Sequence, residues 1–316
     1  MRRAVCLGVG AAMLALAPIA VSSQELLIEH VSAPAKAVQM IEQINARLEA
    51  GASPVRLSEA SFFTLGVGTD SNRLLRLGSR WPQPQVTYVL DQSDYTHWVP
   101  AADAEAALVS AYASWSNIPN TTIYATRVPD DGSNFDILDA IVLDGAGNCV
   151  SILDTTSPNL VGISPAGGLF INPAADVVVG GWLPPAYFDN CLGSSAILGV
   201  TFTFSIADQN GDNYRDAVYA EQFYNEGYRW VTSGAAYLNF SLMDIESIAV
   251  HEDGHALGLD HFGGPNAHEP FRLQPNGKVY DPEAVMNPAY LGGSGKRSPL
   301  PTDEAALRAL YARKGN

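Results

Sequence analysis

Hydrophobic residues recur along the chain with two periods, and each period predicts one kind of secondary structure. Spacings of three and four residues predict amphipathic helices. Helices are expected over residues 34–50, after Pro100, from around Ser241 or Asp244, and from Thr302, whose hydroxyl can cap the last helix. The first should bury Val38, Ile41, Ile44 and Leu48, and the second Leu108, Ala111, Tyr112 and Trp115.

Short runs rich in β-branched and aromatic residues predict strands. These runs cover residues 85–90, 121–128, 136–143, 197–205 and 217–223. Residues 51–80 are weakly patterned and rich in Gly and Ser, which is typical of a linker or pro-segment. Residues 144–195 are rich in Gly, Pro and Asn and suggest a long insertion. The mixture predicts an α+β fold, with a twisted, mostly five-stranded sheet over a long helix and a smaller part after Gly258.

Composition and charge exclude several classes of protein. The chain has 316 residues, of which 47% are hydrophobic, so it can bury a core and is not expected to be disordered. Heptad repeats and a Gly-X-Y period are both absent from it, which excludes coiled coils and collagen. The formal net charge is −15, which argues against a nucleic-acid or anionic-membrane partner.

The only long apolar run lies at the start of the chain. Arg2 and Arg3 precede the apolar residues 4–21, and Ser22 and Ser23 follow. This order predicts a signal peptide over residues 1–23, hence a secreted or periplasmic protein without stable membrane association after cleavage. The alternative is a membrane anchor, because about 18 residues nearly span a bilayer. Residues 24–77 then form an N-terminal segment, interpreted as a pro-region or linker, with a fixed N-terminal subdomain and a partner-binding arm as alternatives.

Signal cleavage would also remove Cys6 and leave two cysteines, Cys149 and Cys191. An even pair in an exported chain predicts one disulfide, which would staple the expected insertion. Two buried free thiols are the alternative.

A histidine motif carries the strongest chemical signal in the chain. Residues 251–261 read HEDGHALGLDH. His251 and His255 lie one helical turn apart, so both imidazoles project from one face and suit a shared ion. Glu252 is rotated by about 100° from His251, so its carboxylate can reach a water at that ion without taking a ligand position. We therefore expect Glu252 to be the general base.

A third imidazole follows after a helix break. Gly258 is expected to end the helix in a left-handed conformation, and His261 arrives three residues later. Three neutral imidazoles leave one position open for water, the pattern of a catalytic Zn²⁺ site. The sequence therefore predicts one catalytic zinc ion bound by His251, His255 and His261.

This motif resembles the zinc signature of the metzincin metalloproteases, and the Leu257-Gly258-Leu259 run resembles the matrixin branch most. Residues 284–288 (AVMNP) resemble the Met-turn of that family, in which Met286 would underlie the zinc-binding histidines. The likeness runs over roughly residues 78–314, interrupted by the expected insertion. The resemblance implies a catalytic domain over 78–316 with a zincin fold, substrate added as a strand along 197–205, and a side-chain pocket lined by residues 287–291.

The chain also departs from the matrixin pattern. Matrixins carry a pro-segment cysteine that blocks the zinc, and residues 24–80 contain no cysteine. The second, structural zinc of the family uses additional histidines, and none occurs between His97 and His251. We therefore expect neither that latency mechanism nor a second zinc.

A second motif offers oxygen ligands. Asp208, Asn210, Asp212 and Asp216 stand at spacings that resemble the first part of a calcium loop. Tyr219 stands where such a loop has its last glutamate. The alternative is a polar turn between two strands, with Asn-Gly at 210–211 as the turn signal. Ca²⁺ therefore stays a second expected cofactor beside the alternative of a plain turn.

The function expected from these features is a secreted zinc endopeptidase that acts on a protein or peptide substrate. The alternative is a zinc-bearing, non-proteolytic binding or adhesive exported domain. Glu252 favours the enzyme, because a site that only binds metal does not need a carboxylate there.

Overall fold

The structure is a computed structural model. It describes residues 35–50, 53–65, 79–92, 94–132, 141–147, 149–151, 175–233, 241–266, 279–281, 283–290 and 296–312. Residues Val31–Asn316 form one compact unit. The expected signal peptide and Cys6 lie outside the described residues. Among the described residues, no helix is both long enough and apolar enough to cross a membrane.

The centre of the fold is an eight-stranded mixed sheet with the strand order β14-β1-β8-β9-β7-β3-β4, in which β2 also pairs with β9. Its strands are β1 (Arg56–Leu65), β2 (Ser79–Arg80), β3 (Gln85–Leu90), β4 (Tyr124–Arg127), β7 (Val177–Leu183), β8 (Ile197–Ile206), β9 (Arg215–Asn225) and β14 (Ala289–Tyr290). The sheet therefore has more strands than the mostly five that the sequence predicted. The coarser prediction, a mixed fold with a sheet core and few helices, is confirmed.

Short ribbons and helices complete the described part. The ribbons pair β5 (Ile141–Leu143) with β6 (Cys149–Ser151), β10 (Arg229–Val231) with β11 (Leu242–Asp244), and β12 (Gly264–Asn266) with β13 (Val279–Asp281). The helices are α1 (Ala35–Ala50), α2 (Ala101–Ser116), α3 (Pro185–Tyr187) with the adjoining π-helical turn η3 (Phe188–Leu192), α4 (Ile245–Ala256) and α5 (Pro301–Tyr311).

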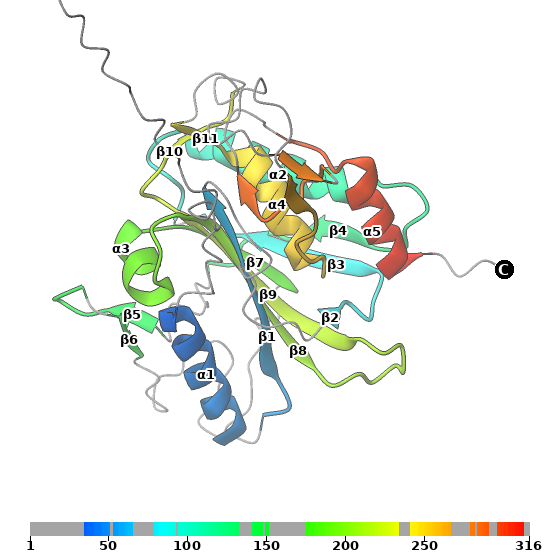
Figure 1. Cartoon of the computed structure of the whole chain (residues 1–316), viewed down its shortest axis with the longest axis horizontal. Helices are drawn as coiled ribbons and strands as arrows, with labels where there is room; N and C mark the ends of the chain where they lie inside the picture. The colour runs from blue at the N-terminus through cyan, green and yellow to red at the C-terminus, as the bar shows by residue number, and fades with distance from the viewer. Residues whose placement is uncertain are drawn as a thin grey trace, which may run out of the picture. The chain divides into compact units, whose positions relative to one another are not determined.

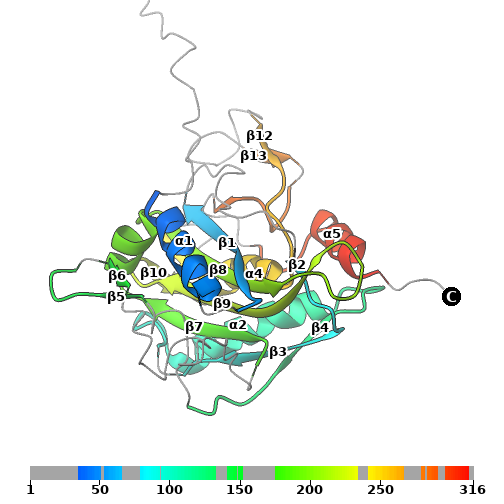
Figure 2. The same ribbon diagram turned by 90° about the horizontal axis from the view of Figure 1, so that it is seen from below.

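Both faces of the sheet are buried, by different helices (Figures 1 and 2). In β1, Phe62 belongs to the core that contains α1, whereas Phe63 belongs to the core that contains α2 and α4. In β3, Val89 packs on the first side and Leu90 on the second. Because side chains alternate along a strand, the sheet separates two apolar cores, and helix α4 with the histidine motif lies on one side only.

All four expected helices are present, as α1, α2, α4 and α5, and they differ from the expectation in detail, whereas α3 with η3 was not expected. Helix α2 buries all four of its expected residues. Helix α1 instead turns Val38 outward, with 37% of its surface exposed, because its buried stripe is centred on Ala37, Ile41, Ile44 and Leu48. Thr302 does not cap α5, which begins at Pro301; the Thr302 hydroxyl donates to the carbonyl of Glu283.

Two of the long strands of the main sheet lie where the sequence predicted none. Strand β7 is a central strand inside the expected insertion 144–195, so that boundary is wrong for residues 177–183. Its sequence is interrupted by two glycines, and Gly181 has φ +86° at a register shift. Strand β1 lies inside residues 51–80, so the linker interpretation is wrong for residues 56–65. Of the run 136–143, only Ile141–Leu143 is described, and it pairs with β6 outside the main sheet.

The predicted disulfide is present. Cys149 in β6 is bonded to Cys191 in η3, with the Cα atoms 5.0 Å apart. The disulfide links the β5–β6 ribbon to η3, the turn before β8. This turn also packs against α1.

Candidate metal centre

Helix α4 is fixed at both ends by side chains from elsewhere in the chain. At its start, the Asp244 carboxylate accepts a hydrogen bond from the Ser247 amide at 3.0 Å and forms an ion pair with Arg297 at 2.6 Å. At its end, the Trp81 indole donates to the carbonyl of Ala256 at 2.7 Å, and Tyr311 donates to that of Leu257 at 2.9 Å. The free carbonyls at the helix end are therefore satisfied, which holds the motif in place.

The chain reverses directly after α4. Gly258 has φ +90°, the left-handed conformation expected from the sequence, and a side chain there would meet the carbonyl of Ser79 at 2.7 Å. The Leu259 amide donates back to the carbonyl of Gly254 at 2.9 Å. This turn brings His261 under the helix face that carries His251 and His255.

The three predicted histidines converge. Their Nε2 atoms are 3.0 Å from one another in all three pairs. The opposite ring nitrogens of two of them are held by backbone carbonyls: His251 Nδ1 lies 2.8 Å from the carbonyl of Val285, and His255 Nδ1 lies 2.8 Å from that of Leu259. A carbonyl only accepts, so each Nδ1 carries the proton and the Nε2 lone pair points to the common centre.

This donor set fits one cation. The centre of a triangle with 3.0 Å sides lies about 1.7 Å from each corner. All three nitrogens could therefore hold one ion with imidazole bonds of about 2.0–2.1 Å at the same time. Among the described residues, these histidines are the one group of three or more ligand-type side chains close enough to hold a metal.

Burial keeps His251 neutral. His251 is fully buried, which lowers the pKa of its imidazole to about 3, against a smaller opposing effect of the Val285 carbonyl. A neutral imidazole is the form that binds metal.

Glu252 faces the side of β8 that is turned toward helix α4, where Gly199 and Thr201 lie. Its Oε2 accepts a hydrogen bond from the Thr201 hydroxyl at 2.6 Å. Its Oε1 lies so close to Gly199 that a Cβ there would be 2.5 Å away. Burial raises the pKa of this carboxyl to about 8, although the bond from Thr201 acts in the opposite direction. Glu252 is thus held by one oxygen, in surroundings that favour proton uptake near neutral pH.

Met286 lies directly beneath α4, as the resemblance implied. A Cβ added to Gly254 would be 2.3 Å from the Met286 sulfur and 2.9 Å from the Trp115 ring. The turn itself is held by Asp303, whose carboxylate accepts from the amides of Val285 and Met286 at 2.8 and 3.1 Å. Sequence reasoning missed Asp303, which stands in the first turn of α5 as an ordinary helix-start acid.

Phe63 and Thr201 are two further residues that the sequence did not identify. The Phe63 ring stacks on the His251 ring with centroids 3.7 Å apart. Phe63 belongs to β1, which the linker interpretation left out of the domain. Thr201 lies in a predicted strand, and the spacing of that strand carries no signal for a partner of Glu252.

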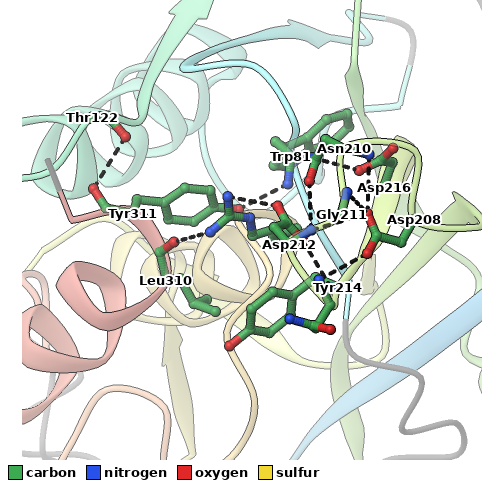
Figure 3. Close-up of polar contacts among 12 residues, drawn as sticks. Trp81, Thr122, Asp208, Asn210, Gly211, Asp212, Tyr214, Asp216, Leu310 and Tyr311 are labelled. Atoms are coloured by element: carbon green, nitrogen blue, oxygen red, sulfur yellow. Dashed lines mark hydrogen bonds and ion pairs between the residues drawn. The ribbon is translucent and has the colours of Figure 1, made fainter. Parts of the chain in front are cut away.

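The second predicted site is a polar turn between β8 and β9 (Figure 3). Asp208 accepts hydrogen bonds from the backbone amides of four following residues, 210 to 213. Asp212 forms an ion pair with Arg80 at 2.7 Å, and Asp216 Oδ1 accepts from the Asn210 side chain at 3.1 Å. The carboxylates are thus used by the loop itself and do not gather into a cluster that could hold a cation. These contacts favour the turn alternative, and the calcium site stays a prediction.

Comparison of the chain with models of known protein families finds no match, and comparison with curated proteins finds no significant match.

Proposed function

We propose that this chain is a zinc-dependent endopeptidase with a metzincin-like, matrixin-type fold. The observation that carries the proposal is that three histidine Nε2 atoms lie 3.0 Å from one another and that a buried glutamate, Glu252, directly follows His251 in the sequence. Three imidazoles and one open position are typical of catalytic zinc. When bound there, Zn²⁺ would lower the pKa of water and polarise a carbonyl.

Glu252 supplies the proton transfers. Its carboxylate takes a proton from the attacking water and delivers it to the leaving amine of the cleaved peptide bond. Thr201 positions it through Oε2, so that Oε1 is the atom that receives the proton. Burial among apolar groups brings the pKa of Glu252 to about 8, which suits a group that must both accept and release a proton.

The substrate class follows from the surroundings of the site. Helix α4, which carries two of the histidines and Glu252, packs against β8, and an extended peptide adds to a strand edge through main-chain hydrogen bonds. We infer a protein or peptide substrate. The apolar start of the sequence supports export to a secreted or periplasmic location, and the acidic charge of −15 disfavours nucleic acid as a partner.

A second candidate is a zinc-bearing binding or adhesive domain without proteolytic activity. One observation favours it, since β1 already covers the edge of β8 beside Glu252. Cleavage of a generic peptide library by the full chain separates the two. Activity that is lost with a zinc chelator and restored by zinc supports the protease. A folded, zinc-loaded chain without activity supports the binding domain.

A further inference from the structure

Strand β1 lies on the edge of β8 that borders the metal centre. The two strands are antiparallel, with Phe62 opposite Val200 and Phe63 opposite Gly199. Gly199 is the residue against which Glu252 Oε1 lies. The backbone of residue 63 therefore runs beside Gly199, the residue of β8 that lies against the proposed general base.

The end of β1 is also bound on its other side. Thr64 pairs with Ala289 and Leu65 with Tyr290 in a parallel ladder with β14. Strand β14 begins three residues after Met286, so this ladder belongs to the wall that follows the Met-turn. The last residues of β1 thus lie between the sheet edge and that wall, with backbone pairing to both.

The Phe63 side chain lies in contact with the candidate metal centre. Its ring stacks on His251 with 3.7 Å between centroids and meets Tyr290 edge-on at 5.9 Å. It borders a pocket that is also lined by Val285, Ala289, Tyr290 and Lys296. Phe62 faces the opposite side of the sheet and packs in the core with α1.

We propose that residues 56–65 are a built-in competitor, and that a peptide reaches the metal centre only when the end of β1 leaves the β8 edge. The inference rests on the proposed function. A peptide that adds to a strand edge needs unpaired main-chain groups, and β1 already pairs with this edge. A tethered competitor acts at high effective concentration, so it raises the apparent KM for substrate and leaves kcat nearly unchanged.

The side chains on the two faces of β1 show which part of the strand a peptide substrate can displace from β8. Leu57, Ala60 and Phe62 are buried in the core with α1, so the first part of the strand stays in place. Phe63 and Thr64 contact the metal-centre side and β14. Phe63 also indicates the side chain that the pocket accepts, a large aromatic one.

Hydrogen exchange on the zinc-loaded full chain tests the competition without any mutation. The probe is a peptide hydroxamate that carries a phenylalanine side chain. When it binds, the amides of residues 61–65 should exchange faster, while those of β3 (Gln85–Leu90) should not change. Binding of the probe with residues 61–65 still protected would overturn the inference.

A variant gives a second, independent readout. Thr64→Pro removes a backbone N–H from the end of β1, where Thr64 pairs with Ile197 and Ala289, and leaves every residue assigned to the metal centre unchanged. It should lower the apparent KM for a fluorogenic peptide by about tenfold or more, with kcat changed little. Leu90→Ala is the control, because it removes a buried side chain from β3, which three strands separate from β1. Equal KM values for wild type and Thr64→Pro would overturn the competitor but leave the protease. Absence of chelator-sensitive turnover in both would instead contradict the proposed function.

Discussion

The histidine centre and the Asp208–Asp216 turn both begin as motifs of metal-ligand residues at suggestive spacing, and they differ in where the lone pairs point. At the centre, backbone carbonyls hold the outer nitrogens of His251 and His255, so the inner nitrogens face one point. In the turn, the carboxylate of Asp208 faces the backbone amides of its own loop. Spacing predicts which residues are near one another, and the partners of their remaining atoms decide whether they can bind an ion.

The largest expected effect is on turnover, and it concerns only the histidine centre. Glu252→Gln should retain zinc and lose on the order of 100-fold or more in kcat, because the amide cannot accept the proton of the attacking water. Peptide cleavage and elemental analysis of the same preparation measure both properties. Wild-type cleavage by this variant would remove the role given to Glu252.

Zinc content compares the histidine centre and the Asp208–Asp216 turn directly. His255→Ala should weaken zinc binding by at least about 100-fold, since even loss of an outer partner of a ligand costs 10–100-fold. Asp208→Asn, the matched change in the turn, should leave the zinc content at the wild-type value. Inductively coupled plasma measurements after equal dialysis decide between them. Equal zinc loss in both variants would contradict the distinction.

Close packing under the centre predicts a stability effect. Gly254→Ala places a methyl group 2.3 Å from the Met286 sulfur, so the turn or the helix must shift. We expect a loss of about 1–3 kcal/mol in the free energy of unfolding. A double-mutant cycle with Met286→Ala should show coupling between the two changes. If the two changes in the free energy of unfolding were additive, Met286 would not be in close contact with Gly254 of α4.

The raised pKa of Glu252 predicts a pH dependence for the metal-free chain. This pKa is about 8 in the folded chain and 4.5 in its ordinary state. Between these values the folded chain binds the proton more strongly than the unfolded chain, so stability falls as the pH rises from about 4.5 to about 8. Glu252→Gln lacks this fall and should melt a few degrees above wild type at pH 9, with the difference gone at pH 4. A constant difference across this range would contradict the shift.

The smallest expected effect is in the turn. Asp212→Asn breaks the ion pair with Arg80, in which both side chains are partly exposed, so the loss should stay below about 1 kcal/mol. Added Ca²⁺ should raise the melting temperature of neither this variant nor wild type. A calcium-dependent rise in wild type alone would restore the calcium interpretation.

Local patterns predicted much of this structure, because they depend on neighbours in sequence. The helix period found α2 and its buried face, and the spacing of His251, His255 and His261 found the centre. The disulfide followed from the cysteine count.

Pairing between distant segments was not predictable in this way. Strand β7 is broken by two glycines, and β1 has a weak pattern because both of its faces are buried. Asp303 and Thr201 act on residues 17 and 51 positions away, and such contacts leave no periodic signal in one sequence.

X-ray absorption spectroscopy at the zinc edge, on the full chain loaded with one equivalent of Zn²⁺, is the decisive measurement for the histidine centre. We expect one tightly held ion with three histidine nitrogens at about 2.0–2.1 Å and one further light-atom ligand. Binding through sulfur, through carboxylates alone, or at fewer than three imidazoles would contradict it.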